Sequence, residues 1–502
     1  MKKFIKFFKF YLIIICLLLC SSAEAVSRAD FLAALLEARG LASVADLKNN
    51  SEFAASPAEF ILKTGIITDY VDIKDVKAKV TRREALRWCI QALGLAFEAD
   101  IISDFNFTHN FTDINNLTRL EKGAVSVAVT MQPNLIANNT KFNGNQAISD
   151  KDMRTLLAKV KEASAGLILD VNIAPAEGIT LLVHREGVFS GIPKWRVYAD
   201  NFNDKEQAEA AQKFFKSKGY EMTALHPLYE YFLRSQVMDN YNQVRALINL
   251  IRKRGHTARV LPSLSNPKTD ILPKYWSMLI IDPSYWNMMP VIIPNEGGRT
   301  LAPLSEIISA NKNKNLRAAI NAGFFAMTKK RTGYPIGILK IDGTQFTQPN
   351  LNRSCIAWNN NSYNTEDIEA MIGKYDKENP NWESMENIIQ AGPLLIDEGE
   401  PVTNNEGFDS KILSVRHPRS AVGITNDGFW FFIALDGRNG LHSSGATISE
   451  LTEILLSYNA EYALNLDGGG STELIHNNKL YNFPSEGKER PISYGLGIMP
   501  LN

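Results

Sequence analysis

The residues best suited to chemistry lie at 462–472, where the chain reads YALNLDGGGST. The apolar run at 462–466 predicts a short buried strand. An acid, three glycines and two hydroxyl residues follow it, namely Asp467, Gly468, Gly469, Gly470, Ser471 and Thr472. Because glycine has no Cβ atom, a ligand can approach this backbone closely. The stretch indicates a site for an oxygen-rich or anionic ligand, with a glycine-rich turn beside an exposed acid as the alternative.

A second apolar run, at 429–435, also ends in an acid, Asp436. Residues 447–450 (TISE) have the pattern of a capping box, which predicts a helix between the two strands. Strands joined by such a crossover are expected to be parallel and, as neighbours, roughly 4.8 Å apart. Asp436 and Asp467 would then form an acid/base pair, or bind calcium or magnesium together with Asn465. Which acid would act as acid and which as base stays open.

Cationic side chains precede a third predicted strand at 421–425. They are Arg416, His417 and Arg419, and Arg438 follows soon after the second strand. A guanidinium group matches the geometry of phosphate and can donate two hydrogen bonds to it. The cluster therefore indicates a phosphate site, and the alternative is that these side chains pair with the two acids.

Three further residues are candidates for the site. Asn321 is expected at the end of another strand, where its amide would hold a sugar hydroxyl or a phosphate oxygen; the alternative is that it satisfies a buried turn. His442 is a weaker candidate proton donor than His417. Cys355 is a weak candidate nucleophile, since free cysteine is usually a small buried hydrophobe. No Cys/His cluster has the spacing of a zinc site.

The chain from about residue 275 to 502 resembles the phosphodiester glycosidase family. Six short motifs carry this resemblance in order, at 321–325 (NAGFF), 391–393 (AGP), 416–423 (RHPRSAVG), 436–438 (DGR), 465–472 (NLDGGGST) and 490–492 (RPI). The resemblance implies hydrolysis of the bond between a sugar and a phosphodiester. The arginines and the glycine amides, with Ser471, would hold the phosphate, and the two acids would act on the glycosidic oxygen or the attacking water.

The rest of the chain predicts further domains. Helix starts at 27–30, 81–84 and 149–152 suggest a diverged repeat at 26–166. This repeat resembles S-layer homology repeats, which implies binding to cell-wall polysaccharide or peptidoglycan. A plain helical domain is the alternative. Residues 190–263 resemble a SPOR domain, or form a structural spacer. The expected fold is multidomain: an N-terminal all-α repeat domain, a small α+β middle domain, and a C-terminal α/β domain at 270–502 with a mixed sheet.

The first 25 residues predict a signal peptide, with four lysines, an apolar stretch at 11–19 and a small-residue cleavage pattern. Removal would leave no membrane span and two cysteines, Cys89 and Cys355, in different domains, so no disulfide framework is expected. The formal net charge is +0, which gives no general attraction for nucleic acid. We expect an exported protein of a bacterial cell envelope, wall-associated or periplasmic.

These patterns together predict an exported, cell-wall-associated hydrolase that cleaves the glycosidic bond of a sugar-1-phosphodiester. Two alternatives remain open from the sequence. One is a metal-dependent phosphodiesterase that acts on envelope polymers, and the other is a wall-binding structural protein without catalysis.

Overall fold

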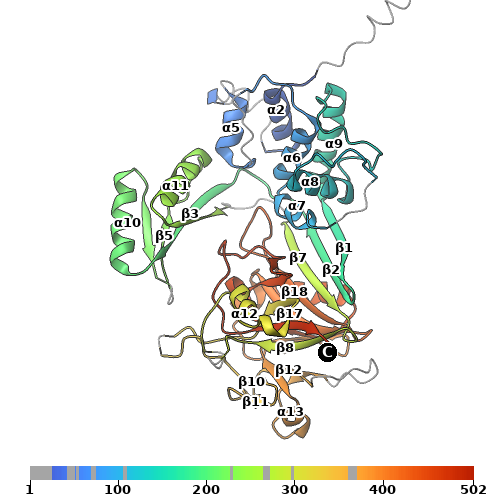
Figure 1. The fold of residues 1–502 in the computed structure, drawn as a ribbon, viewed down its shortest axis with the longest axis vertical. Helices are drawn as coiled ribbons and strands as arrows, with labels where there is room; N and C mark the ends of the chain where they lie inside the picture. Colours follow the sequence, from blue (N-terminus) through green and yellow to red (C-terminus); the bar gives the residue numbers. More distant parts are fainter. Residues whose placement is uncertain are drawn as a thin grey trace, which may run out of the picture. The chain divides into compact units, whose positions relative to one another are not determined.

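The computed structural model describes residues 25–41, 51–52, 56–68, 75–105, 110–226, 230–263, 272–294, 299–328, 330–359 and 370–501. The chain divides into two compact units, 1–166 and 167–502 (Figure 1). The predicted signal peptide at 1–25 lies outside the described residues except for Ala25. Across the described ranges, no helix is both long enough and apolar enough to cross a membrane.

The described part of the first unit consists of helices and isolated β-bridges. The helices are α2 (Arg28–Ala38), α5 (Pro57–Thr64), α6 (Arg82–Ala92), α7 (Ala96–Ile102), α8 (Arg119–Thr130) and α9 (Asp150–Gly166). Thr81 caps α6 in the predicted capping box with Glu84, and Ser27 caps α2. An all-α unit of wall-binding repeats stays a prediction, because residues 42–50 and 69–74 lie outside the described ranges.

The predicted middle domain is a four-stranded antiparallel sheet in the order β4-β5-β3-β6, with two helices. Its elements are β3 (Lys194–Phe202), α10 (Lys205–Ser217), β4 (Met222–Leu225), β5 (Tyr231–Ser235), α11 (Tyr241–Lys253) and β6 (Thr257–Ser263). The chain order is βαββαβ, which is the ferredoxin-like arrangement. The sequence predicts both helices, at 205–218 and 242–253, and the three strands at 195–198, 222–225 and 257–261, but β5 was missed.

The largest sheet has the order β1-β2-β7-β18-β17-β19-β15-β16. Its strands are β1 (Ile168–Ala176), β2 (Ile179–Glu186), β7 (Lys274–Ile281), β15 (Leu394–Asp397), β16 (Glu400–Pro401), β17 (Arg419–Thr425), β18 (Trp430–Leu435) and β19 (Ala460–Asn465). The βαββαβ unit lies in the chain between β2 and β7, and β2 pairs with β7 along its whole length. The boundary predicted at residue 270 leaves out β1 and β2, which are part of this sheet.

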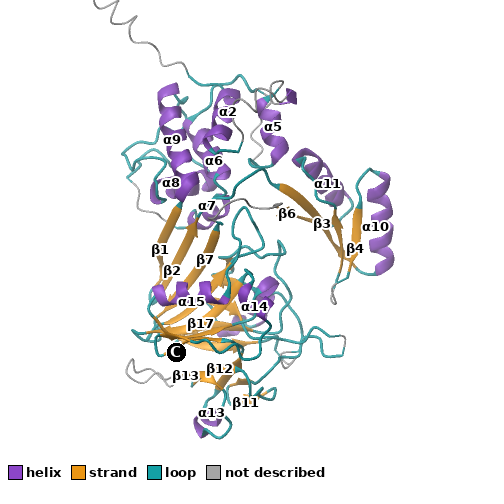
Figure 2. Cartoon of the chain, turned by 180° about the vertical axis from the view of Figure 1, so that it is seen from behind, coloured by secondary structure: helices purple, strands orange, loops and turns teal. Residues whose placement is uncertain are grey.

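Helix α15 (Ile448–Ser457) begins at the predicted capping box of Thr447 and Glu450. Leu451 and Leu455 of this helix pack in one apolar cluster with residues of β7, β17, β18 and β19. Figure 2 shows α15 lying across the face of the sheet. The helix thus buries its apolar side against the strands whose ends carry the candidate acids.

Two five-stranded sheets complete the second unit. The first has the order β11-β10-β14-β12-β13 and contains β10 (Leu339–Ile341), β11 (Thr344–Gln345), β12 (Ser354–Trp358), β13 (Ala370–Lys374) and β14 (Asn387–Gln390). The second has the order β21-β20-β9-β22-β8 and contains β8 (Trp286–Val291), β9 (Ala318–Asn321), β20 (Leu474–His476), β21 (Lys479–Leu480) and β22 (Gly495–Pro500). The remaining helices are α12 (Leu304–Ala310), α13 (Pro380–Ser384) and α14 (Ser410–Ser414).

Two predictions about the sheet are wrong. The sheet is not mixed, because every strand pair among the described residues is antiparallel. β18 and β19 run in the same direction but are not neighbours, since each pairs with β17 between them. The physical reason is the tight turn that folds β17 back on β18, so that α15 must carry the chain to the far side of β17. Two strand spacings, roughly 10 Å, separate β18 from β19.

Candidate active site

Asp467 lies two residues beyond β19, partly exposed, at the start of the glycine stretch. Burial raises the pKa of its carboxyl group to about 6, although the Ser471 hydroxyl, Arg490, the Gly468 N–H and Arg438 all favour the charged form. A carboxyl group with this pKa exists in both protonation states near neutral pH. It can therefore accept or donate a proton in a reaction.

Two guanidinium groups lie over the glycine stretch. A Cβ atom on Gly470 would lie 2.1 Å from Arg490 Nη2, and one on Gly469 would lie 3.1 Å from Arg438 Nη2. Gly469 also has φ +66°, a conformation that side-chain-bearing residues rarely adopt. These glycines are thus required because the arginines approach the backbone so closely.

The two arginines bring like charges together beside the acid. Burial and the neighbouring Arg490 lower the pKa of Arg438, while Glu486 and Asp467 act in the opposite direction. Arg438 Nη2 lies 3.3 Å from His417 Nδ1, and Arg490 pairs with Glu486. Burial, Arg438 and Arg419 in turn lower the pKa of His417. A set of cations of this kind favours an anionic ligand, which would relieve their mutual repulsion.

The buried side chain of Asn321 hydrogen-bonds to three other segments of the chain and is not a free ligand group. Its Nδ2 donates to the Asp467 carbonyl oxygen at 2.5 Å. Its Oδ1 accepts from Ser420 Oγ at 2.7 Å and from the Glu473 N–H at 3.1 Å. Both functional atoms of the amide are therefore in use, and the residue positions the Asp467 loop against β17.

Asp436 lies in a different environment from Asp467. It is 1% exposed, and its Oδ2 atom lies 2.8 Å from His442 Nε2 and accepts from the Phe483 N–H at 2.7 Å. Asn482 Nδ2 donates to Oδ1 at 3.2 Å. Burial raises the pKa of Asp436, and His442 is the largest of the influences that oppose this rise. The carboxylate and the candidate proton donor His442 thus form a buried pair that holds the 481–483 segment.

Arg416 and Arg419 have partners other than phosphate in this structure. Arg416 pairs with Glu450 of the α15 capping box, Nη2 to Oε1 at 2.6 Å. Arg419 is buried, with Nε donating to the Ala446 carbonyl at 2.9 Å and Nη2 donating to the Ile412 carbonyl at 2.6 Å. Burial and Arg438 lower the pKa of Arg419 to about 10. Of the predicted arginines, the structure therefore brings Arg438 to Asp467 and gives the other two supporting contacts.

The residues proposed for a cation do not converge. Asp436 is bound to His442 and Asn482, and β17 separates it from Asp467. The Asn465 Nδ2 donates to the carbonyls of Gly392 and Leu466, both at 2.8 Å. Within the described residues, no group of three or more His, Cys, Asp or Glu side chains is arranged to hold a metal ion. The residues proposed for calcium or magnesium, as arranged here, therefore do not fit a bound cation.

Three residues near the acid were not named as site residues from the sequence. Arg490 lies in the RPI motif, and the motif itself was its only signal. Burial and the nearby Asp467 raise the pKa of Tyr494, whose hydroxyl would lie 2.3 Å from a Cβ on Gly323. Glu473 directly follows Thr472 and is fully buried; burial and Glu489 raise its pKa well above the ordinary value.

The candidate nucleophile Cys355 is buried, and burial and Glu406 raise the pKa of its thiol, which disfavours a thiolate.

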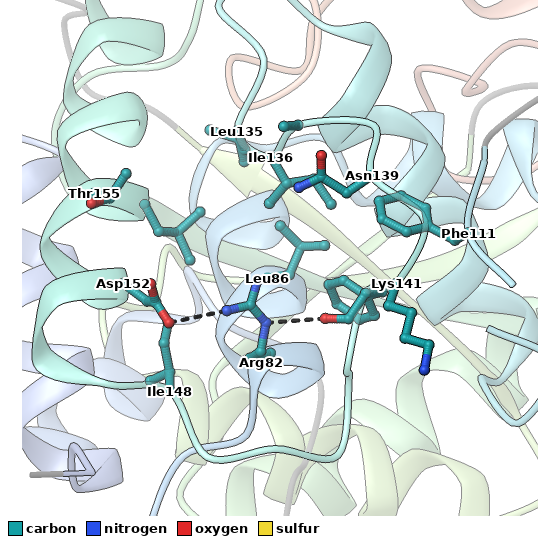
Figure 3. A pocket seen from close by; sticks show the side chains of 13 residues that line it. Arg82, Leu86, Phe111, Leu135, Ile136, Asn139, Lys141, Ile148, Asp152 and Thr155 are labelled. Carbon is teal, nitrogen blue, oxygen red and sulfur yellow. Dashed lines mark hydrogen bonds and ion pairs between the residues drawn. The ribbon is translucent and has the colours of Figure 1, made fainter. Parts of the chain in front are cut away.

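The first unit contains a pocket of its own with a cavity of ≈ 170 Å³, shown in Figure 3. Arg82, the second residue of the predicted TRRE motif, lies in its wall. Its Nη1 donates to Asp152 Oδ2 at 3.2 Å, and its Nε donates to the Phe142 carbonyl at 3.0 Å. Phe111 and Lys141 line the same pocket. A cation, an aromatic ring and apolar side chains are therefore gathered at one of the repeat-like helix starts.

A carboxyl group of raised pKa therefore lies beside two arginines on the glycine stretch. Residues 314–499 match the family model described as phosphodiester glycosidase. The match supports a phosphodiester glycosidase domain in the C-terminal part of the chain. It includes Asp467, both arginines, the glycine stretch and Asn321.

The chain is also similar to individual proteins. It is 41% identical over 86 residues to the SPbeta prophage-derived uncharacterized protein YomE of Bacillus subtilis, covering 17% of this chain and 13% of that protein. It is 31% identical over 103 residues to N-acetylglucosamine-1-phosphodiester alpha-N-acetylglucosaminidase of Mus musculus, covering 20% of each. The chain thus spans a fifth or less of the length of these relatives.

The catalytic domain of the zebrafish N-acetylglucosamine-1-phosphodiester alpha-N-acetylglucosaminidase, auto-inhibited by its pro-peptide, is a structural neighbour with a TM-score of 0.37 and 21% identity. The match covers 45% of this chain and 77% of that chain.

Proposed function

We propose that this protein hydrolyses the glycosidic bond of a sugar-1-phosphodiester. The observation that carries the proposal is the Asp467 carboxyl group, with a pKa of about 6, between Arg438 and Arg490 on the glycine stretch. N-acetylglucosamine is the first sugar to test, because the mouse relative is named for it. The family match at 314–499 supports the same activity.

In the proposed reaction, water attacks the anomeric carbon while the bond from that carbon to the bridging oxygen breaks. Asp467 takes the proton from the water, and the bridging oxygen leaves with the phosphate as a phosphomonoester. Arg438 and Arg490 neutralise the charge that grows on this leaving group. The products are the free sugar and the phosphomonoester of the alcohol.

The pH dependence follows from the role of Asp467. A general base acts only when deprotonated, and the folded pKa of this group is about 6. We expect kcat/KM to rise about tenfold per pH unit below this value and to level off above it. A pH–rate profile measured between pH 4 and 8 checks this. A rate that falls as the pH rises through 6 would instead make Asp467 the acid.

The activity itself is tested by incubating the purified protein with a diester of N-acetylglucosamine 1-phosphate and a simple alcohol. The proposal predicts free N-acetylglucosamine and the alcohol's phosphomonoester. Release of N-acetylglucosamine 1-phosphate and the free alcohol would identify the alternative phosphodiesterase. Absence of any product across a panel of sugar-1-phosphodiesters would favour the non-catalytic wall-binding alternative.

We further propose that the protein is exported and bound to the cell wall through its first unit. The observation that favours this is the pocket that contains Arg82, Phe111 and Lys141. A wall-located enzyme would meet sugar-phosphate polymers, which are plausible substrates by their chemistry. The 190–263 unit, with its SPOR-like chain order, is proposed as a second part that contacts the envelope.

Wall binding is expected to depend on Arg82. The purified protein should co-sediment with cell-wall sacculi, and Arg82→Ala should weaken this about tenfold, because the loss of a guanidinium removes charged hydrogen bonds to an anionic polymer. Arg154→Ala is the matched control, since that side chain is 78% exposed and, among the described residues, forms an ion pair only with Asp150 of its own helix. Equal sedimentation of the Arg82→Ala and wild-type proteins would show that this pocket is not the anchor.

A further inference from the structure

The βαββαβ unit has one sheet face covered by helices and one that lines a pocket. Residues of alternate strand positions, such as Val197 and Leu233, pack against α10 and α11. The residues between them point to the opposite face, because side chains alternate along a strand. Arg196, Tyr198, Phe232 and Arg234 occupy that face, with Arg259 and Leu261 of β6.

This sheet face and two arginines of the candidate active site line one cavity of ≈ 490 Å³. The opposite wall comes from the glycosidase domain and includes Met327, Arg438, Ser485, Glu486 and Arg490. A volume of this size is typical of pockets for small ligands. Arg438 and Arg490 therefore belong both to the surroundings of Asp467 and to the cavity wall.

Direct contacts join the two walls. Lys488 Nζ pairs with Glu230 Oε2 at 2.6 Å, and Arg259 Nη1 donates to the Glu486 carbonyl oxygen. A Cβ on Gly487 would lie 3.2 Å from Leu261 Cδ2, so the 485–490 loop packs against β6. The βαββαβ unit therefore forms the wall of the cavity on this side.

The cavity is strongly cationic. Five arginines and two glutamates line it, which leaves a formal charge of five minus two, or +3. Arg259 is held in place, because it pairs with Asp200 through Nε to Oδ2 at 2.6 Å and stacks over the Tyr198 ring at 4.8 Å. Low-dielectric walls lined by one sign of charge concentrate ligands of the other sign.

Two of the arginines on the sheet face are available to a ligand. The Arg234 side chain has no hydrogen bond or ion pair to any described residue, and the Arg196 side chain makes one long hydrogen bond, from Nη1 to the Ser235 carbonyl at 3.4 Å. Arg234 lies opposite Tyr198 in the strand register, which makes it the diagonal neighbour of Arg196. Such neighbours lie roughly 7–8 Å apart, within reach of one anionic group for side chains of this length.

We propose that Arg196 and Arg234 form a subsite for a second phosphate on the leaving-group side of the substrate. The inference rests on the proposed function: Arg438 and Arg490 hold the phosphate that is cleaved from the sugar, and the alcohol of that diester extends across the cavity toward the sheet. The preferred substrates are then sugar-1-phosphodiesters whose alcohol carries a further phosphate, as in a chain of phosphate-linked units. The βαββαβ unit selects these substrates.

The test compares three esters of N-acetylglucosamine 1-phosphate. The alcohols are propanol, 3-hydroxypropyl phosphate and 4-hydroxybutyrate, so that the last two differ in the terminal anion. We expect a KM about tenfold lower for the phosphate-bearing ester than for the propyl ester, since charged hydrogen bonds to phosphate are strong. Arg196→Ala and Arg234→Ala should bring this ratio close to one. Arg252→Ala, an exposed arginine on α11, should keep it.

Direct binding separates this inference from the proposed function. Calorimetry with propane-1,3-diyl bisphosphate should show about tenfold weaker binding to Arg234→Ala than to the wild type, even if no ester is hydrolysed. Circular dichroism of each variant checks that the fold is kept, and Arg196→Ala replaces Arg234→Ala if the latter unfolds. Equal binding by the variants and the wild type would overturn the subsite. Equal preference for the carboxylate ester would overturn its assignment to phosphate.

Discussion

Replacing Asp467 with asparagine is expected to lower kcat/KM by about 10³-fold or more while the fold is kept, because the variant has no group to take the proton from water. Asp467 is partly exposed, and asparagine keeps the volume of the side chain and one of its two oxygen acceptors, so the fold is expected to tolerate the change. Rates with an N-acetylglucosamine 1-phosphodiester, together with a thermal melt, check both parts of this expectation.

Asp436→Asn is the matched control for that variant. Asp436 holds His442, Asn482 and the Phe483 N–H in a buried network, so its replacement should cost about 1–3 kcal/mol of unfolding free energy. Turnover per folded molecule should fall much less than for Asp467→Asn. If Asp436→Asn abolishes turnover without loss of stability, or if Asp467→Asn remains fully active, then the acid has been assigned to the wrong residue.

Arg438→Ala is expected to lower kcat/KM by about 10²-fold, because it removes a cation aimed at the charge that develops on the leaving phosphate. Arg438→Lys should restore only part of this, since an ammonium group cannot bind phosphate through a planar fork. Steady-state rates at fixed ionic strength, with sugar release as the readout, measure the effect.

Arg416→Ala is the comparison for Arg438→Ala. Its side chain is 38% exposed and pairs with Glu450, so its removal should cost no more than about 1 kcal/mol of stability and leave kcat/KM within about twofold. Burial raises the pKa of Glu450, but Arg416, the Thr447 N–H and Lys274 outweigh this effect and hold that pKa at about 2. A loss of activity for Arg416→Ala as large as that for Arg438→Ala would show that the phosphate lies elsewhere.

Local patterns in the sequence were sufficient to predict the strands and the helix that carry the candidate site. The apolar runs of β18 and β19 and the capping box of α15 each depend on residues close together in the chain, and all three are confirmed. The position of Asp467 at the end of a strand follows from the same local signal. β5 was missed because its apolar run at 231–233 is only three residues long and is followed at once by Arg234 and Ser235.

The pairing of strands that are distant in the chain could not be predicted from local sequence patterns. The two acids were expected side by side, but β17 pairs with both strands, and nothing in the residues of β18 or β19 shows which strand each will meet. The partners of Asp436 come from residues 482 and 483, nearly fifty positions later. Arg416 and Arg419 have the residue type of a phosphate site, and only their contacts with Glu450 and with backbone carbonyls distinguish them from Arg438.

The most direct test of the proposed function is hydrolysis in ¹⁸O-labelled water. The measurement is the ¹⁸O content of the phosphomonoester product by mass spectrometry, since oxygen on phosphate does not exchange with water under these conditions. If water attacks the anomeric carbon beside Asp467, the phosphomonoester carries no label and the incorporated oxygen is on the sugar. Label in the phosphate product would mean that the P–O bond is cleaved, and the protein would then be a phosphodiesterase.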